Sequence, residues 1–578
     1  MAHSSILSFI ALILLLIALS QAQPPAGNGR DGEDQGPVDA GTAVFDGRMG
    51  LNCAEEEFRR FDGACTNRAT PLRQLFGSTR LPQFSYFGRR SSDRIRDNVR
   101  SLPSPRLISN IVAKQTMDVR ERRGLNELVT FFGQFIDHTL VATPVNNGAS
   151  EDGETVPREP FFIDVPEDDP MLANITGGQL RFFRSRRATV EERSTEVRPI
   201  NSLTSLLDLD SVYGASEERA GFLRTNSGGL MRVGRNNLLP QNSMRLSNEP
   251  RLDRKFFVAG DLRSNEHPML TSIHTIFLRE HNDIATELQT TFPDFNDERL
   301  YQTARQINIA QFQKIVFDEW YPAITGRRLP LWRRFQANVD PAVSVLFSTA
   351  AFRIGHTLVN NVVSRQRSGN RNMRPLTLQD TFFSNVNLIL NTGIDSFLRG
   401  AANTRAQEVD LMVVDALRNF LFTNVNGADG LDLIALNLQR SRDHGVPFYN
   451  DVRARFRRGN RARTFADITR NTNVQSALQT AYGSVDNVEA WIGLMAEDKP
   501  RVSSMGPTML AIWVREFIRI RDGDSFYYEN MSQYDPEVLA NVPRLRAIFN
   551  GQDTMRALLL RHTGITNGEL PSRTFFAN

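Results

Sequence analysis

Cysteine is almost absent from this chain of 578 residues. Only Cys53 and Cys65 are present, and no histidine lies between them to help complete a metal site of the kind that zinc uses. In an oxidising compartment, an even pair so close in sequence forms one disulfide that closes a short loop. We therefore predict a single disulfide bond between these two residues.

A large excess of charge of one sign is also missing, because the formal net charge is only +3. This excludes the strong positive potential on which nucleic-acid-binding proteins depend, and no nucleic-acid partner is expected. The arginine-dense stretch Arg453–Arg463 is interpreted as solvated surface. The hydrophobic content of 40% excludes disorder of the chain as a whole and is sufficient for a sizeable core.

Long apolar runs are missing after the N-terminal segment. Ile6–Gln23 contains a largely apolar run of about fourteen residues, too short to cross a bilayer comfortably, and ends in small residues that suit a signal peptidase. We predict a signal peptide at residues 1–22, a flexible leader or propeptide rich in Gly, Pro and Asp at residues 23–50, and one large domain at residues 51–578. The mature protein is expected to be secreted, extracellular and soluble, without a transmembrane segment.

Apolar residues recur at three- and four-residue spacing through several long segments, whereas strand-like alternation is scarce. The segments predicted to be helical are Leu125–Leu140, Met269–Leu288, Leu300–Trp320, Val343–Val363, Glu408–Phe422 and Met509–Arg521. The fold class is therefore mainly α, with long loops and little β structure. Loops such as Gly148–Gln179, rich in Asp, Glu and Pro, are expected outside the core. The sequons at Asn174 and Asn530 are candidate glycan acceptors, given secretion.

The stretch "FFGQFIDHTL" combines an apolar helix face with three polar residues. Gln134 and His138 are four residues apart and Asp137 lies beside them, so all three share one face of the helix. Buried polar groups need hydrogen-bond partners or a ligand. For one such residue, a hydrogen-bonded place in the core is the simplest explanation, but three together indicate a functional site.

The four stretches "FFGQFIDHTL", "AGDLRSNEHP", "AFRIGHTLV" and "ALNLQRSRDHG" resemble motifs of the animal haem peroxidase family. "FFGQFIDHTL" resembles the distal-helix motif of that family, and "AGDLRSNEHP" resembles its catalytic-arginine motif. "AFRIGHTLV" resembles the proximal-histidine motif, and "ALNLQRSRDHG" the segment that supports this histidine. Further similar stretches extend the resemblance from about Cys53 to the C-terminal "HTGI". The motifs are specific and stand in the order found in the family.

The resemblance implies an enzyme that cleaves hydrogen peroxide heterolytically to a ferryl oxidant and then oxidises halides, pseudohalides or small phenols. His138 would be the distal histidine that moves the proton, and Arg263 would stabilise negative charge on the breaking O–O bond. Gln134 would hydrogen-bond the small ligand. His356 would be the axial ligand of the haem iron, with Asn437 bonded to its other ring nitrogen.

The resemblance also implies how haem b is held. Arg353 and Arg440 match residues that pair with the haem propionates, for which the guanidinium geometry is well suited. Asp137 and Glu266 stand where the family forms ester bonds to haem methyl groups. The strongest chloride oxidisers of the family have methionine directly after the ester glutamate, and this chain has His267 there. Iodide, thiocyanate and bromide are therefore expected to be better substrates than chloride.

A calcium site is implied as well, with its charge relocated. The family has an aspartate after the distal histidine, but this chain has Thr139. The metal-binding loop reads "TSLLDLDS" and offers Thr204, the backbone carbonyl of Leu206, Asp208, and Asp210 in place of a serine. Relative to the family pattern, the carboxylate after the distal histidine is missing and a carboxylate is added at Asp210. Two negative charges therefore remain among the hard oxygen ligands that calcium prefers.

Two alternative functions are a haem-dependent fatty-acid dioxygenase and an extracellular adhesion or binding protein. A haem-dependent fatty-acid dioxygenase belongs to the same superfamily, but it needs a tyrosine where this chain has Arg353. An extracellular adhesion or binding protein on the same fold would not need the intact set of His138, Arg263, His356 and Asn437. Contact with the extracellular matrix or a cell surface could accompany catalysis.

Overall fold

The fold is known from a computed structural model of the chain. It describes residue 53 and residues 57–67, 102–145, 160–174, 176–186, 199–251, 253–384, 386–423 and 430–577. The signal peptide and the leader predicted for residues 1–50 lie outside the described residues. Within the described part of the chain, no helix is both long enough and apolar enough to cross a membrane.

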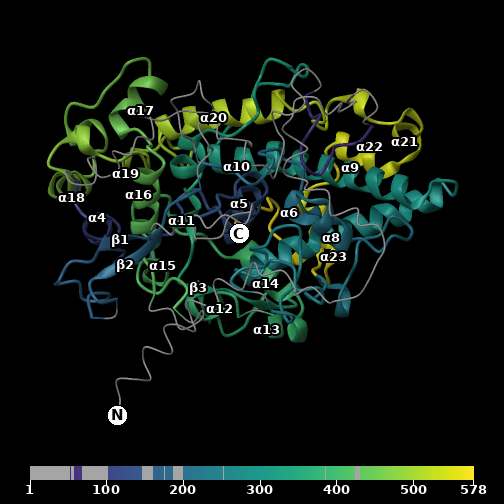
Figure 1. Ribbon diagram of the computed structural model, residues 1–578, viewed down its shortest axis with the longest axis horizontal. Coiled ribbons are helices and arrows are strands. Elements are labelled where there is room, and N and C mark those ends of the chain that lie inside the picture. Colours follow the sequence, from purple (N-terminus) through teal and green to yellow (C-terminus); the bar gives the residue numbers. More distant parts are fainter. Residues whose placement is uncertain are drawn as a thin grey trace, which may run out of the picture.

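The prediction of a mainly α fold is confirmed (Figure 1). The longest helices are α5 (Glu127–Leu140), α8 (Pro268–Thr291), α9 (Asp297–Ile315) and α20 (Pro507–Asp522). The other α-helices are α4 (Pro105–Val112), α6 (Asp210–Tyr213), α7 (Glu217–Leu223), α10 (Tyr321–Thr325), α11 (Gly355–Leu358), α12 (Leu378–Thr381), α13 (Val386–Thr392), α14 (Asp395–Asn403), α15 (Asp415–Arg418), α16 (Leu433–Asp443), α17 (Tyr449–Phe456), α18 (Thr472–Tyr482), α19 (Ala490–Ala496), α21 (Pro536–Asn541), α22 (Pro543–Phe549) and α23 (Met555–His562). Two π-helical turns, η3 (Val316–Trp320) and η4 (Phe347–Ala351), and the short 3-10 turns η2 (Arg235–Asn237), η5 (Phe465–Asp467), η6 (Val485–Asn487), η7 (Met531–Gln533) and η8 (Asn567–Glu569) complete the helical elements.

Two of the six predicted helices are wrong in extent. The predicted helix Val343–Val363 is divided into the π turn η4, the four-residue α11 and the start of a strand at Val362. Only α15 forms within the predicted helix Glu408–Phe422. The residues before α15 are extended, and Val413 pairs with Lys114 in a parallel bridge. Apolar spacing had suggested a helix there, but the β-branched Val413 and Val414 also suit extended backbone.

The β structure consists of three small antiparallel sheets. Strand β1 (Pro160–Asp164) pairs with β2 (Gln179–Phe183), β3 (Val362–Val363) with β6 (Leu376–Thr377), and β4 (Gln366–Arg367) with β5 (Arg371–Asn372). The first hairpin starts within the loop predicted for Gly148–Gln179 and continues past its end, because β2 begins at Gln179. It is not wholly outside the core, because Ile163, Leu180 and Phe182 form a small buried cluster with Ala435 of α16.

Helix α5 runs through the centre of the molecule, with α8 and α11 around it (Figure 1). Its apolar side enters the main core, where Phe132 and Phe135 contact Phe277 of α8 and Phe312 of α9. Aromatic rings bury large areas, so this contact fixes α5 firmly against two long helices. The opposite side of α5 remains available for polar residues.

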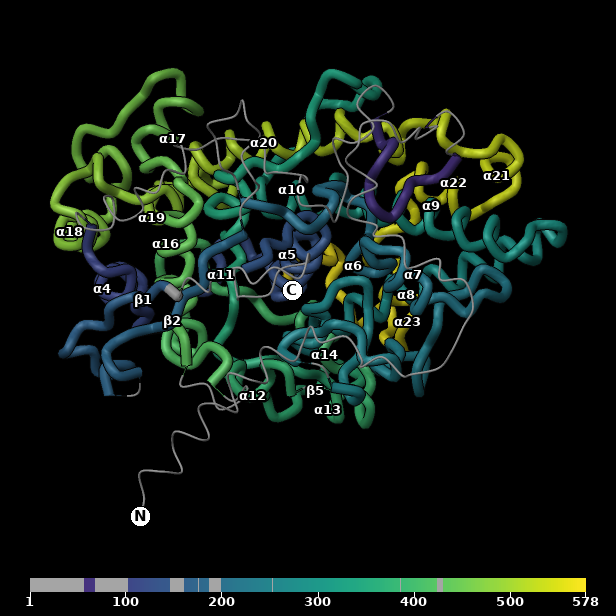
Figure 2. The backbone as a smooth tube through the Cα atoms, in the orientation of Figure 1, coloured from purple at the N-terminus to yellow at the C-terminus, as the bar shows by residue number. Residues whose placement is uncertain are grey.

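The N-terminal end of α5 is tied to distant parts of the chain. The side chain of Asn126 caps the helix by accepting from the Val129 N–H. Its amide nitrogen donates to the carbonyls of Ala402 and Thr574. The backbone of Leu125 also pairs with that of Phe576, so the C-terminal end lies beside α5 (Figure 2).

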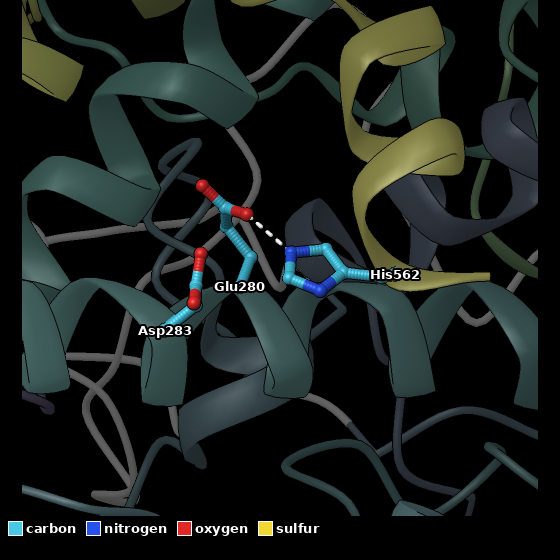
Figure 3. A group of neighbouring side chains, drawn as sticks. All are labelled: Glu280, Asp283 and His562. Atoms are coloured by element: carbon cyan, nitrogen blue, oxygen red, sulfur yellow. Dashed lines mark hydrogen bonds and ion pairs between the residues drawn. The ribbon is translucent and has the colours of Figure 1, made fainter.

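A second polar cluster ties the C-terminal helices to α8. Glu280 of α8 is fully buried and bonds with Arg544 of α22 and Arg561 of α23. It also bonds with His562 of α23, as Figure 3 shows. Glu280, Asp283 and His562 are close enough together to suggest a metal site. However, the two guanidinium groups already neutralise Glu280, and Arg544 also binds Asp283. The cluster is therefore an ion-pair network that joins α8, α22 and α23.

The predicted disulfide between Cys53 and Cys65 is present. The segment around it is held by Arg59, whose buried guanidinium binds Asp524 beyond the end of α20. The disulfide loop is therefore packed onto the domain.

Candidate active site

Helix α5 presents Gln134, Asp137 and His138 to one cavity. Burial lowers the pKa of His138 well below its usual value, and the positive charge of Arg263 acts in the same direction. Burial raises the pKa of Asp137 to about 6, although Arg263 and Arg353 oppose the shift. The imidazole of His138 is therefore neutral at physiological pH and can accept a proton.

Arg263 lies in the loop before α8 and is held by Asp261. The Arg263 backbone N–H and Nε donate to Asp261 Oδ1 at 2.8 and 2.9 Å, and Nη2 donates to Oδ2 at 2.7 Å. Nη1 donates to the carbonyl of Val141, at the end of α5. These hydrogen bonds hold the Arg263 guanidinium beside the distal helix, so the position of its positive charge is fixed.

Asp261 also faces His138, and sequence reasoning missed this residue. Its Oδ1 lies 3.7 Å from His138 Nδ1. Burial opposes ionisation of Asp261, but the charge of Arg263, the neighbouring His138 and the hydrogen bonds from Arg263 together outweigh burial and lower the pKa of the carboxyl group. A permanent carboxylate beside Nδ1 favours the proton on that nitrogen and leaves Nε2 as the basic atom. The signal was present in the sequence, since the acid stands two residues before Arg263 in "AGDLRSNEHP".

Glu266 and His267 follow on the same loop, and both line the cavity. Burial raises the pKa of Glu266 to about 7, while Arg263 and a hydrogen bond from Gln134 oppose the shift. The His267 ring stacks on Phe131 of α5, with ring centroids 4.2 Å apart. His267 also caps α8, because its Nδ1 accepts the Met269 N–H.

His356 of α11 faces the same cavity and contacts Asn437 of α16. The amide nitrogen of Asn437 is 2.8 Å from His356 Nδ1, and the amide oxygen accepts from Arg353 Nη1 at 2.6 Å. The expected contact is present, but with the amide turned so that its NH2 group faces the ring. Burial and the charge of Arg353 lower the pKa of His356 to about 3, so the ring is neutral. Arg440 also reaches the cavity and is anchored by Ser185 and Asp443.

The cavity has a volume of about 430 Å³ and mostly apolar walls. This size is typical of sites for drug-sized ligands or cofactors. It brings together the predicted catalytic and cofactor residues except Asn437, which lies behind His356. Trp320 and Trp513, which the sequence did not single out, form part of the wall and stack on each other.

The loop predicted to bind calcium runs into α6, next to α5. Thr204 Oγ1 donates to Asp208 Oδ2, and both residues are buried. Neither carboxylate oxygen of the buried Asp210 has a hydrogen-bond partner among the described residues. Burial and the neighbouring Asp208 raise the pKa of Asp210 well above its usual value. This carboxylate is therefore suited to a cation.

Ser211, which the sequence did not single out, joins this loop to both distal residues. Its hydroxyl is 2.8 Å from Thr139 Oγ1, next to His138. Its backbone carbonyl accepts from the Asp261 N–H at 2.9 Å. Thr139 also donates within α5, to the carbonyl of Phe135. A shift of the loop would therefore reach His138 through Thr139 and Arg263 through Asp261.

The fold and the cavity agree with the family comparison. The family model described as animal haem peroxidase matches residues 58–574. The chain therefore belongs to the animal haem peroxidase family, and the expected family is confirmed. Peroxinectin A of Dictyostelium discoideum is 34% identical over 82% of this chain and 89% of its own length. Human eosinophil peroxidase is 33% identical over 88% of this chain and 76% of its own length.

Solved structures agree with this assignment. Peroxidase A from Dictyostelium discoideum superimposes with a TM-score of 0.79 and 29% identity, covering 90% of this chain and all of that one. A fatty acid alpha-dioxygenase from Oryza sativa gives a TM-score of 0.74 at 17% identity, covering 91% of this chain and 88% of that one. The second likeness shows the fold alone. Eosinophil peroxidase and peroxidase A are named peroxidases, and with the family match the chain is accordingly a haem peroxidase.

Proposed function

We propose that the protein is a secreted peroxidase that uses hydrogen peroxide to oxidise halides, pseudohalides or small phenols. The observation that carries the proposal is the single cavity that joins His138 and Arg263 to His356. When bound, haem supplies the iron centre that reacts with peroxide and takes electrons from the reducing substrate. The residues of the chain supply the proton transfer, the fixed charge and the means of holding the group.

The residues of the cavity fit haem. His356 is neutral and uses Nδ1 for Asn437, so Nε2 is left for the iron. The iron-bound form needs the proton on Nδ1, which would then donate to the oxygen of Asn437. With the amide turned over, Asn437 would accept from Nδ1, and Arg353 would be available to hold a haem propionate. Arg440 supplies a second guanidinium for the other propionate.

On the distal side, the proton moves through His138. Because Nδ1 faces Asp261, Nε2 is the atom that takes a proton from hydrogen peroxide and returns it to the departing oxygen, which leaves as water. Arg263 contributes a fixed positive charge where negative charge develops. Gln134 hydrogen-bonds the small ligand. Asp137 and Glu266 are proposed to form ester bonds with haem, and Thr139, Thr204, Leu206, Asp208 and Asp210 to surround a calcium ion.

Secretion is supported by the disulfide between Cys53 and Cys65, because such bonds persist mainly in oxidising compartments. Asn174 is exposed, as a glycan acceptor must be. Asn530 is less suited, because its amide nitrogen donates to the carbonyl of Ser525. The proposal also includes a signal peptide at residues 1–22, a leader at residues 23–50 and the peroxidase domain at residues 51–578. Contact with the extracellular matrix is part of the same proposal.

An absorption spectrum of the purified protein, taken before and after addition of peroxide, tests the function. We expect a haem band that shifts on addition of peroxide. In His138→Gln the haem should remain bound, while the reaction with peroxide slows by about 10²- to 10⁴-fold, the usual contribution of a general base. Retention of the wild-type rate in this variant would contradict the role of His138. A wild-type protein without haem would contradict the function itself.

A further inference from the structure

Aromatic rings in contact with one another lead away from the cavity wall. Trp320 and Trp513 line the cavity, and their ring centroids are 5.6 Å apart. The Phe517 ring of α20 contacts both, with its centroid 6.2 Å from that of Trp320 and 5.4 Å from that of Trp513. The Phe317 ring of η3 meets Phe517 edge-on at 6.1 Å. All four side chains are buried, so the path leads from the cavity into the protein interior.

The contacts continue to two tyrosines in the loop after α20. The Tyr527 ring meets the Phe317 ring edge-on at 5.4 Å, and the Tyr528 ring lies 4.8 Å from that of Tyr527. Both tyrosines are buried. The ring series that runs from the cavity wall to this loop therefore consists of Trp320, Trp513, Phe517, Phe317, Tyr527 and Tyr528.

The phenol at the end of the ring series has a partner that can take its proton. The Tyr528 hydroxyl donates to Glu529 Oε1 at 3.0 Å, and Glu529 is partly exposed. Burial and the negative charges of Asp318 and Glu529 raise the pKa of Tyr528, so the phenol keeps its proton at physiological pH. In the described part of the chain, two other buried tyrosines donate to carboxylates, but their rings have no contact with the ring series: Tyr449 and Tyr482.

This combination suits the transfer of one electron. Indole and phenol rings are among the side chains that give up an electron most readily, and a phenol must release its proton when it does so. Electron tunnelling slows steeply with distance, so closely spaced rings allow an electron to cross a span that would be too long for one step. Haem is a cofactor for one-electron chemistry. A buried phenol with both a ring path to the cavity and a proton acceptor is therefore a candidate electron donor.

We propose that Tyr528 is a redox site that donates one electron to the haem cavity after peroxide has reacted and when no reducing substrate is present. The electron passes along the ring series and reaches the cofactor that peroxide has oxidised. The O–H bond of Tyr528 breaks as Glu529 takes the proton, and a neutral tyrosyl radical remains. Hydrogen peroxide is the oxidant, so electrons and protons balance. The inference rests on the proposed peroxidase function and adds a site at which an oxidising equivalent leaves the cavity.

The test is electron paramagnetic resonance of the holoenzyme, frozen after mixing with peroxide in the absence of a reducing substrate. Protein labelled with ring-deuterated tyrosine distinguishes a tyrosyl signal from a tryptophanyl signal. Tyr528→Phe removes the hydroxyl and keeps the ring, and Glu529→Gln removes the proton acceptor. Tyr482→Phe is the matched control, because this buried phenol also donates to a carboxylate but lies outside the ring series. Haem content and the rate of reaction with peroxide are recorded for each variant.

We expect a tyrosyl signal in the wild type and in Tyr482→Phe, its loss in Tyr528→Phe, and a lower yield in Glu529→Gln. Haem absorption should also bleach faster under excess peroxide in Tyr528→Phe than in Tyr482→Phe, because the oxidising equivalent stays in the cavity. Haem content and the rate of reaction with peroxide should remain at the wild-type level in all three variants.

A tyrosyl signal that persists unchanged in Tyr528→Phe would overturn the redox site. A radical confined to tryptophan would also overturn it, since Trp332 contacts Tyr527 at 5.6 Å and is partly exposed. So would the absence of any protein radical in a wild-type enzyme that binds haem and reacts with peroxide. A wild-type protein without haem contradicts the peroxidase function itself, so the two failures are distinguishable.

Discussion

At the scale of single residues, the distal site depends on a carboxylate that does not touch the cavity chemistry itself. Asp261 bonds Arg263 through three nitrogen atoms and lies beside His138. Catalytic groups must be held within fractions of an ångström of their productive positions. One buried side chain therefore positions both the proton carrier and the fixed charge.

The ester bonds are tested by extracting haem under denaturing conditions. Asp137 and Glu266 both line the cavity, and burial raises the pKa of both carboxyl groups. After exposure to peroxide, haem should stay with the wild-type polypeptide in acidic acetone. It should also stay with Asp137→Asn or Glu266→Gln, each of which retains one bond. The double variant should release all of it. Complete extraction from the wild type would reject the esters without rejecting the enzyme.

We expect the halide preference to depend on His267. A sulfonium bond from methionine at this position would withdraw electrons from haem, and histidine cannot form it. Steady-state rates at neutral pH should therefore be higher for iodide, thiocyanate and bromide than for chloride. His267→Met should raise the rate with chloride relative to that with bromide. Equal rates with chloride and bromide in the wild type would contradict this expectation.

At the scale of elements, α5 depends on the loop that leads into α6. Thr139 and Asp261 both bond to Ser211, which follows Asp210 directly. A cation held by Asp208 and Asp210 would offset the repulsion between these buried carboxylates. The metal would thereby stabilise the distal side of the site as well as the loop.

Metal analysis and chelation test this site. We expect about one tightly bound calcium ion per chain, and loss of both the calcium and the native Soret band in Asp210→Ala, because an ion that binds only the native fold stabilises it. Asp294→Ala, which removes an exposed carboxylate, is the matched control and should retain both. A wild-type protein that contains no calcium and is insensitive to strong chelators would reject the site.

The sequence predicted elements well where one periodicity dominated. Segments around α5, α8, α9 and α20 have apolar stripes, and each forms one long helix. Val343–Val363 was predicted as one helix, but the helix is interrupted on both sides of α11, the short helix that carries His356. The backbone conformation that the site needs there is not visible in the apolar periodicity. The region before α15 is extended because it pairs with Lys114, some 300 residues away, which local spacing cannot reveal.

The site itself was predicted from motifs, and geometry added what motifs do not contain. His138, Arg263, Glu266 and His356 do line one cavity. The shared role of Asp261 and Ser211 depends on distances between separate loops. No local signal in the sequence predicted that Trp320 and Trp513 line the cavity, because both residues also resemble ordinary core residues.

At the scale of the whole molecule, stability depends on the network around Glu280. Burial alone would raise the pKa of Glu280, but His562, Arg544 and Arg561 lower it to about 2. Its folded pKa lies below the ordinary value, so this stabilisation is complete above about pH 4.5 and is lost as the pH falls through about 2. A shift of this size corresponds to about 3 kcal/mol.

Glu280→Gln should lower the free energy of unfolding by about 3–5 kcal/mol near neutral pH, because two guanidinium groups lose their buried partner. Asp283→Asn is the comparison, since about half of the Asp283 side chain is exposed and its pair with Arg544 should contribute less than about 1 kcal/mol. Urea denaturation of the holoenzyme measures both. The difference between Glu280→Gln and the wild type should shrink as the pH approaches 2. Equal effects of the two substitutions would contradict the network.

The tie between Asn126 and the C-terminal residues has a consequence for biosynthesis. A ribosome completes α5 long before it makes Thr574 and Phe576, yet the amide of Asn126 and the backbone of Leu125 need them as partners. Contacts so distant in sequence form late. The nascent chain therefore carries a distal helix without these partners until Thr574 and Phe576 have left the ribosome, and haem can meet a complete site only after that.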